Sequence, residues 1–158
     1  MMPREVRRLE ATDVERIEAE EPAGQGFVRA MWKLQQRDES VLIVAWVDGM
    51  PVGSAQLDLR TDPWEVKNLN VDERARGEGI GTALMAEAER LAAPSGRLSV
   101  GVGVDNPRAR ALYERLGFRP TGQESTTTYE YVDERGVRRT ATETDVLLMK
   151  DLAAAPSA

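Results

Sequence analysis

Two hydrophobic spacings alternate along this chain and divide it into strand-like and helix-like segments. Residues 41–47 are continuously apolar and rich in β-branched side chains, and residues 98–104 alternate apolar with small side chains, so both are predicted to be strands. Apolar residues recur every three or four positions in residues 27–36 and 80–92, which is typical of amphipathic helices. The whole pattern predicts strand 5–9, helices 12–20 and 27–36, strands 41–47, 52–59 and 64–71, helix 80–92, strand 98–104, helix 107–116, and strands 126–132 and 137–149.

Turn and capping residues mark the ends of these elements. Asp48-Gly49 is a strong hairpin signal between two strands. Thr12 and Glu15 have the spacing of a capping box, and Gly117 suits the end of a helix. The element order, β-α-α-β-β-β-α-β-α-β-β, predicts an α/β fold with a mixed sheet.

The length of 158 residues suits one domain with a proper core. Neither a repeat nor a linker interrupts the pattern of elements. We therefore predict a single domain over residues 1–152, followed by a loose tail of small residues at 153–158.

Two residue types, cysteine and histidine, are absent from the composition. Their absence excludes disulfides, thiolate nucleophiles, Ser-His-Asp triads and metal sites with Cys or His ligands. We expect no metal site, and any acid–base chemistry must use carboxylates, Tyr, Lys, the backbone or water.

The net charge of −6 lacks the basic footprint that general nucleic-acid binding needs. Residues 1–10 are charged and contain no apolar stretch typical of a signal peptide, and the apolar run at 41–47 is too short to span a bilayer. We expect a cytoplasmic protein that binds neither nucleic acid nor membranes. The sequence leaves a homodimer open.

The strand at 64–71 changes phase in its middle. Apolar residues occupy even positions up to Val66 and odd positions from Leu69 onwards. A strand of period two needs one extra residue for such a change, which predicts a β-bulge at Lys67-Asn68. The alternative interpretation is that Trp64 merely flanks an irregular strand end.

A glycine-rich turn, Arg76-Gly77-Glu78-Gly79-Ile80-Gly81-Thr82, leads from this strand into the next helix. Glycines allow a ligand to approach the backbone, and successive N–H groups at a helix N-terminus bind anions, so phosphate is the natural ligand. The turn is neither a P-loop, because Gly-Lys-Ser/Thr is missing, nor a Gly-x-Gly-x-x-Gly motif, because position 82 is Thr. A tight turn without a ligand is the alternative.

A second motif, Asn106…Ala109…Leu112-Tyr113-Glu114-Arg115-Leu116-Gly117-Phe118, lies downstream. By itself it is also explained structurally, with Asn106 as a helix cap and Tyr113 in the core. Together with Arg76-x-x-Gly79-x-Gly81 after a strand with an inferred bulge, it resembles the Gcn5-related N-acetyltransferase (GNAT) family. The segment 145–150 resembles the last strand of that family, so the resemblance covers nearly the whole chain.

This resemblance implies a GNAT-like acyl-CoA N-acyltransferase fold and direct transfer of an acetyl group from acetyl-CoA to a primary amine. It implies that the glycine-rich turn holds the CoA pyrophosphate, and that strand backbone and Asn106 contact the pantetheine arm. Tyr113 would protonate the leaving thiolate, since the reference pKa values of phenol and thiol are about 10 and 8.5. The residues that would hold the cosubstrate are Leu69, Val71, Arg76, Gly77, Gly79, Gly81, Thr82 and Asn106.

The general base is Glu65 on the same resemblance, because histone-acetylating members carry a glutamate eleven residues before the position of Arg76. The alternative is that Glu65 is a solvated strand carboxylate and that a chain of water molecules takes the proton.

The acceptor amine leaves a weaker trace in the sequence. Phe27, Trp32 and Tyr129 are the candidate acceptor contacts, and the acidic segment before Phe27 favours a small cationic molecule or a peptide N-terminus. Two other classes of function remain open: a module that binds acyl-CoA without turnover, and a regulatory partner protein in which the glycine-rich turn has no ligand.

Overall fold

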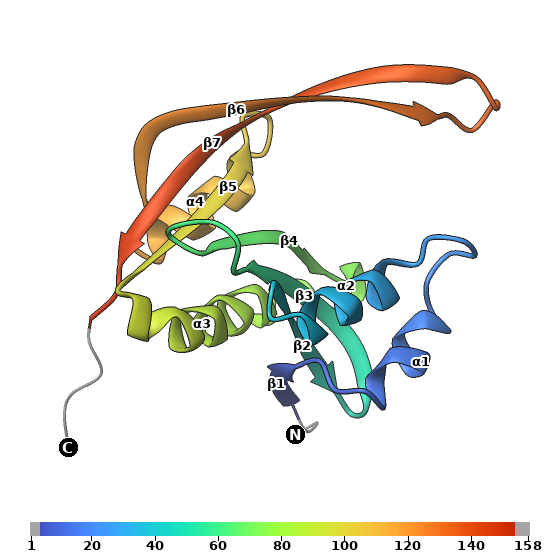
Figure 1. The fold of residues 1–158 in the computed structure, drawn as a ribbon, viewed down its shortest axis with the longest axis horizontal. Coiled ribbons are helices and arrows are strands. Elements are labelled where there is room, and N and C mark those ends of the chain that lie inside the picture. The colour runs from blue at the N-terminus through green and yellow to red at the C-terminus, as the bar shows by residue number, and fades with distance from the viewer. Residues whose placement is uncertain (1–3, 154–158) are drawn as a thin grey trace. The chain divides into compact units, whose positions relative to one another are not determined.

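The computed structural model describes residues 4–153, and its elements follow the predicted order (Figure 1). Within these residues no helix combines the length and apolarity needed to cross a membrane. The elements are β1 (Arg4–Arg8), α1 (Asp13–Glu18), α2 (Phe27–Gln36), β2 (Ser40–Val47), β3 (Met50–Asp58), β4 (Glu65–Val71), η1 (Glu73–Ala75), α3 (Ile80–Ala92), η2 (Ala93–Ser95), β5 (Arg97–Gly103), α4 (Pro107–Arg115), β6 (Arg119–Val132) and β7 (Arg138–Asp151).

The chain divides into two compact units, which we describe separately. Unit 1 comprises the described residues up to Leu98 together with 151–153, and unit 2 is Ser99–Lys150. The α/β class predicted from the element order is confirmed. The expected single domain over 1–152 stays a prediction, and the expected tail at 153–158 lies, apart from residue 153, outside the described residues.

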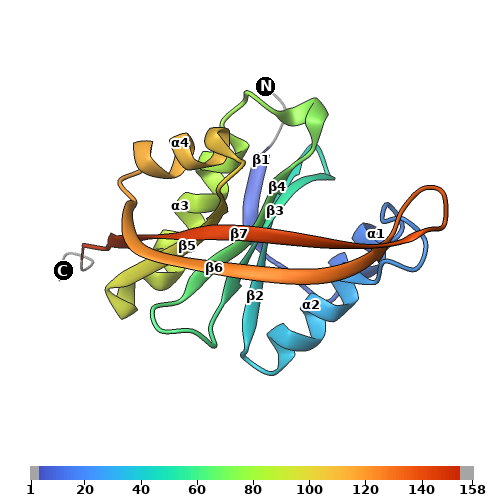
Figure 2. The same ribbon diagram turned by 90° about the horizontal axis from the view of Figure 1, so that it is seen from above.

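Unit 1 is built on four antiparallel strands in the order β1-β2-β3-β4. The helix α3 packs against one face of these strands, and α1 and α2 cover the other (Figure 2). Because β2 is covered on both faces, nearly all of its residues are buried, which explains its unbroken apolar run. On the side of α1 and α2, the core contains Leu9, Val14, Val28, Met31, Leu42, Val44 and Trp46.

The bulge predicted in β4 is confirmed. Ser54 on β3 pairs with Asn70, but Gln56, two residues on, pairs with Lys67, so β4 contains one residue more than β3 over this interval. Asn68 has a φ of +54°, in the left-handed region that asparagine tolerates better than most residues. Asn68 and Leu69 therefore have no register partners on β3.

The capping box predicted at the first helix does not form. Thr12 itself has helical dihedral angles and makes no side-chain capping bond. Asp13, which is buried, instead accepts a hydrogen bond from the backbone N–H of Glu10 at 2.8 Å and pairs with Arg7 at 2.6 Å. This ion pair with β1 fixes the start of α1, and it depends on a tertiary contact that local spacing does not reveal.

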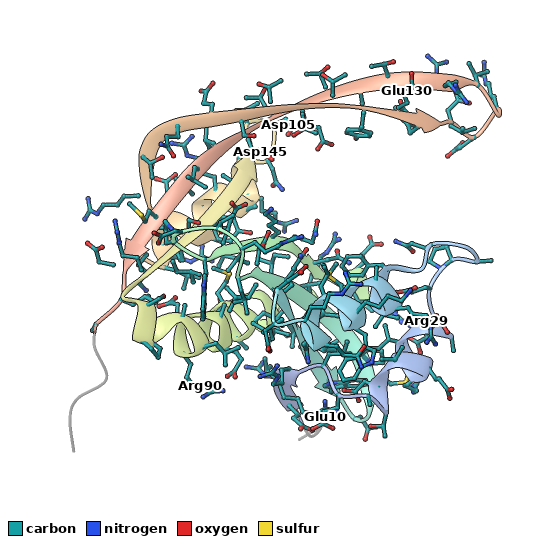
Figure 3. All side chains as sticks on the ribbon, in the orientation of Figure 1. Glu10, Arg29, Arg90, Asp105, Glu130 and Asp145 are labelled. Carbon is teal, nitrogen blue, oxygen red and sulfur yellow. The ribbon has the colours of Figure 1, made fainter. Side chains whose placement is uncertain are left out.

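Unit 2 contains β5, α4 and the long hairpin of β6 and β7. β6 begins at Arg119, well before the predicted start at 126, whereas β7 spans Arg138–Asp151 in place of the predicted 137–149. A register shift falls between Pro120 and Glu124, where Gly122 has a φ of +85°. Side chains in the outer half of the hairpin, Glu130 among them, are exposed (Figure 3). Val104, predicted to close the alternating strand, lies beyond the end of β5 and is exposed.

A buried carboxylate joins the end of β3 to the start of β4. Asp58 accepts hydrogen bonds from Arg60 at 2.9 Å, and its other oxygen lies 3.0 Å from the ammonium of Lys67. Burial alone would raise the pKa of Asp58, but the hydrogen bonds from Arg60 and Lys67 outweigh it and hold the pKa well below its usual range. A carboxyl whose pKa is lowered by folding stabilises the native state above the pKa of the unfolded chain.

We expect Asp58→Asn to lower the free energy of unfolding by about 1–3 kcal/mol at pH 7, because it removes the charge that faces two cations. The wild type should lose this contribution as the pH falls below about 4, so the difference should shrink by pH 3. Urea unfolding at both pH values measures it, with the exposed turn variant Asp38→Asn as control. An equal difference at both pH values would contradict this role.

Candidate functional site

The glycine-rich turn follows β4 directly and is shaped by left-handed residues. Asp72 caps η1 by accepting a hydrogen bond from the backbone N–H of Arg74. Gly77 and Gly79 then adopt φ values of +83° and +79°, which side chains with a Cβ rarely adopt. These two glycines turn the chain into α3, for which Gly79 is the N-cap.

The N-terminus of α3 carries no cap from a side chain. Among the described residues 4–153 no side chain caps this helix, and its first turn contains no acidic residue. A Cβ built on Gly77 or Gly79 would meet no atom within 4 Å, so the space in front of the turn is open. N–H groups at the positive end of a helix, here one of 13 residues, are donors of the kind that bind anions such as phosphate.

Two arginines hold the turn at its ends. Arg76 is exposed, and its Nε donates a hydrogen bond to the carbonyl of Val71 at 3.1 Å, which keeps the guanidinium beside the end of β4. Arg4 on β1 donates to the carbonyl of Glu78 at 3.0 Å. Sequence reasoning missed Arg4, because 74 positions separate the two residues and nothing in the local pattern links them.

Gly53 on β3 allows α3 to approach the strands. A Cβ at this position would lie 3.0 Å from the carbonyl oxygen of Asn70, 3.2 Å from Ile80 and 3.3 Å from Leu84. These distances are tighter than nearly all real Cβ contacts, so a side chain at this position would push its neighbours apart, and the glycine permits the close packing. It brings the first turn of α3 next to the end of β4, where the turn begins.

A cavity of about 260 Å³ lies within unit 1, between the α1–α2 loop and strands β2 to β4. Phe27 lines it, as expected for an acceptor contact, and its charged lining residues are all acidic: Glu20, Glu21 and Asp72. Glu21 uses one carboxylate oxygen to accept a hydrogen bond from the backbone N–H of Val28 at 2.8 Å.

Two other candidates of unit 1 lie away from this cavity. Trp32 is partly buried against the core and borders a separate hollow beside α1. Glu65 is the first residue of β4, in register with Asp58, whereas the cavity is lined by Asn70 and Asp72 at the other end of the strand. The carboxylate of Glu65 therefore lies on the far side of the bulge from the cavity lining.

Tyr113 in unit 2 is 4% exposed and packs edge-on against Phe118, with 6.2 Å between the ring centres. Burial raises the pKa of Tyr113 to about 12. The phenol therefore stays neutral at ordinary pH, and its pKa lies well above the reference value used in the sequence prediction. This burial is also what the core interpretation of Tyr113 expects.

The other candidates of unit 2 have identified partners. Asn106 accepts a hydrogen bond from the backbone N–H of Ala109 at 3.1 Å, so the predicted cap is confirmed. Tyr129 is exposed, and its hydroxyl donates to Glu143 at 2.9 Å.

Comparison with known proteins decides the family. The model of the acetyltransferase (GNAT) family matches residues 8–118, which is more than half of the chain. The chain belongs to the GNAT family. This match runs from the end of β1 to the residue before β6 and includes both GNAT motifs recognised in the sequence.

Individual GNAT proteins resemble this chain to different extents. An uncharacterised N-acetyltransferase of Methanocaldococcus jannaschii is 38% identical over 94 residues, which cover 54% of this chain and 42% of that protein. An N-acetyltransferase structure from Staphylococcus aureus Mu50 superposes with a TM-score of 0.69 at 20% identity, over 96% of this chain and 99% of its own. The structure of yncA from Salmonella typhimurium, solved with its cofactor acetyl-CoA, gives a TM-score of 0.67 at 19% identity over 99% of each chain. These similarities confirm the GNAT fold.

Within the GNAT fold, unit 1 brings one group of predicted residues together. Arg76, the glycines of the turn and Thr82 form one continuous stretch at the start of α3, next to the end of β4 at Val71. Glu65 lies at the opposite end of β4, and Asn106, Tyr113 and Tyr129 belong to unit 2. Among the described residues, no three acidic side chains gather closely enough to hold a metal ion.

Proposed function

We propose that this protein transfers an acetyl group from acetyl-CoA to a primary amine on a small cationic molecule or a peptide. The observation that carries the proposal is the uncapped, glycine-lined N-terminus of α3 directly after a bulged β4. Membership of the GNAT family supports the same reaction, as does the acetyl-CoA in the similar yncA structure.

We assign the CoA pyrophosphate to the turn at the start of α3. The backbone N–H groups of Gly77, Gly79 and Gly81 would hold its oxygens, with Thr82 and Arg76 beside them. Backbone at Leu69 and Val71 would pair with the pantetheine amides, since Leu69 has no register partner on β3. Asn106 would contact the same arm with the part of its amide that does not cap α4.

We propose direct transfer without an acyl-enzyme intermediate, since the chain contains no cysteine to act as the usual nucleophile. The amine nitrogen attacks the thioester carbonyl carbon, a C–N bond forms, and the C–S bond breaks. Negative charge that develops on the carbonyl oxygen would be stabilised by a backbone N–H of the bulge, in the manner of an oxyanion hole. The amine loses one proton to a base, and the CoA sulfur gains one.

We assign the stabilisation of the leaving thiolate to Tyr113. With a pKa of about 12 its hydroxyl is always protonated, so a donor is present at every working pH. Full proton transfer to a thiolate of reference pKa near 8.5 is unfavourable from such a phenol. Tyr113 would therefore act mainly by donating a hydrogen bond to the sulfur, and the proton would follow as CoA leaves.

We assign the acceptor amine to the acidic cavity of unit 1. Glu20, Glu21 and Asp72 would attract a cationic acceptor, and Phe27 would provide an apolar wall. Trp32 and Tyr129 remain candidate contacts for a larger acceptor such as a peptide. Glu65 is the base that the resemblance proposes, and because it lies on the far side of the bulge from this cavity it would take the proton through water; a chain of water molecules without Glu65 is the alternative.

CoA should bind the wild type, and Arg76→Ala and Gly79→Ala should each weaken binding about tenfold or more in isothermal titration calorimetry. The first loses a charge-assisted contact, worth about 1.5–3 kcal/mol. The second puts a Cβ on a residue with a φ of +79°, which strains the turn that would hold the pyrophosphate. Gly49→Ala is the matched control, because Gly49 has a similar φ of +76° and no close neighbour but lies in the β2–β3 turn. Equal binding by all variants would contradict the pyrophosphate site.

Tyr113→Phe should lower kcat by roughly 10²-fold while leaving the Kd for CoA nearly unchanged, because the ring keeps its packing and only the donor is lost. Thiol release in a panel of amines measures turnover, and thermal unfolding checks that the core is intact. The exposed Tyr131→Phe is the control. Full kcat in a folded Tyr113→Phe would return this residue to a purely structural role, and CoA binding without turnover in the wild type would favour the binding module.

Glu65→Gln should reduce the rate at neutral pH more than at high pH, because more of the acceptor amine is already deprotonated at high pH. The wild-type rate should rise with pH as Glu65 ionises, and the variant should lack that rise. Rates across the pH range measure this, with the exposed Glu73→Gln as control. A wild-type pH profile in Glu65→Gln, within a few-fold in rate, would assign the proton to water instead.

A further inference from the structure

Three polar side chains form a continuous hydrogen-bonded chain across strands β2, β3 and β4. Asn68 Nδ2 donates to Gln56 Oε1 at 2.9 Å, Gln56 Nε2 donates to Ser40 Oγ at 3.1 Å, and Ser40 Oγ donates to the carbonyl of Leu57 at 3.1 Å. Gln56 is 4% exposed and Ser40 is fully buried. We call Ser40, Gln56 and Asn68 the bulge clamp.

In the bulge clamp every hydrogen bond has one donor and one acceptor, and the last acceptor is a backbone carbonyl. Each side chain passes one hydrogen bond to the next, and the last one reaches the carbonyl of the residue after Gln56. Loss of a hydrogen-bond partner by a buried amide lowers the stability of the fold. The hydrogen bond between Gln56 and Asn68 therefore restrains Asn68 while it provides Gln56 with a partner. The clamp therefore resists any movement of Asn68 relative to β3.

The apolar pattern confines the bulge to the interval between Val66 and Asn70, but it does not choose which residue of that interval is the extra one. An extra residue could be accommodated one position earlier or later along β4 at the cost of local rearrangement, and each choice would turn a different N–H group out of the sheet. In this protein the left-handed residue is the one whose side chain reaches Gln56. The clamp thus selects Asn68 as the bulged residue and leaves Leu69 as the first residue beyond it.

We infer that the bulge clamp is a positioning device for catalysis: it fixes the bulge so that the backbone N–H beyond Asn68 faces the acetyl carbonyl. This inference rests on the proposed acetyl transfer. Gln56 and Ser40 are positioning residues, since they act through Asn68 and not on the reacting atoms. The clamp does not touch the glycine-rich turn that would hold the pyrophosphate, so loss of the clamp should lower turnover more than it weakens CoA binding through Leu69.

Unit 1 contains a matched control for a purely structural glutamine. Gln35 is 7% exposed and also makes two hydrogen bonds, donating to the carbonyl of Leu9 and accepting from the N–H of Leu42. Both partners lie in the part of the core formed by β1, β2 and α2, away from β4. Gln35→Met and Gln56→Met should therefore cost similar stability and differ only in their effect on the bulge.

The kinetic test compares these two variants with Asn68→Gly, which allows the left-handed backbone without strain and removes the whole side chain with its amide. Gln56→Met and Asn68→Gly should each lower kcat about tenfold or more, with less than about threefold change in the KM for acetyl-CoA, because a misplaced oxyanion donor acts on the transition state. The double variant should be no worse than either single variant, since both break the same chain. Gln35→Met should keep the wild-type kcat.

Hydrogen–deuterium exchange on the protein without ligand tests the clamp itself. The segment 66–71 should exchange faster in Gln56→Met and in Asn68→Gly than in the wild type, and at the wild-type rate in Gln35→Met. Unchanged exchange in both clamp variants, or unchanged kcat in an active protein, would overturn the inference. A wild type that neither binds CoA nor acetylates any amine would instead overturn the proposed function, and only the exchange result would then decide whether the clamp pins the bulge.

Discussion

The extra residue in β4 is the constraint on which the arrangement of unit 1 depends. It splits the strand into two halves with different tasks. The first half stays in register with the end of β3, where Lys67 reaches the buried carboxylate of Asp58. The second half, in register with Gly53 and Ser54, lines the cavity and leads into the glycine-rich turn. One half of β4 thus contacts Asp58 and the other half borders the cavity, and the bulge lies between the two halves.

The net charge of the chain favours cations, whereas the backbone N–H groups at the start of α3 favour anions, and the two effects act over different distances. The net charge is −6, yet the first turn of α3 has no acidic residue and presents backbone N–H groups of the kind that bind anions. Backbone N–H groups act over one hydrogen-bond length, whereas net charge acts over about a Debye length of 8 Å. An acidic surface therefore favours the approach of cations to the cavity, while the proposed phosphate binding would depend on local geometry at Gly77 and Gly79. The proposed anion site at the start of α3 is therefore compatible with the negative net charge of the protein.

Features written into short stretches of sequence were predictable, and features that need two distant segments were not. The phase change around Lys67-Asn68 was sufficient to locate the bulge, and the glycine spacing located the turn into α3. The capping box at Thr12 failed because an ion pair between Asp13 and β1 took precedence.

The bulge clamp and the raised pKa of Tyr113 could not be predicted from local patterns. Gln56 and Asn68 are 12 positions apart, and each resembles an ordinary polar residue on an exposed strand face. The raised pKa of Tyr113 arises from desolvation, which depends on everything packed around the ring. The roles of Glu65 and of the acceptor contacts still rest on the resemblance and the charge pattern.

The outer half of the β6–β7 hairpin, unlike β4, contributes little to the packed core. Its strands are joined by side-chain hydrogen bonds between threonines, Thr126 with Thr144 and Thr128 with Thr142, and its residues are exposed. Substitutions there disturb no core packing and change stability little. Over evolutionary time this segment is free to diversify while β4 and the start of α3 are held by their neighbours. A lineage could therefore alter what the hairpin presents to other molecules without rebuilding the enzyme's interior.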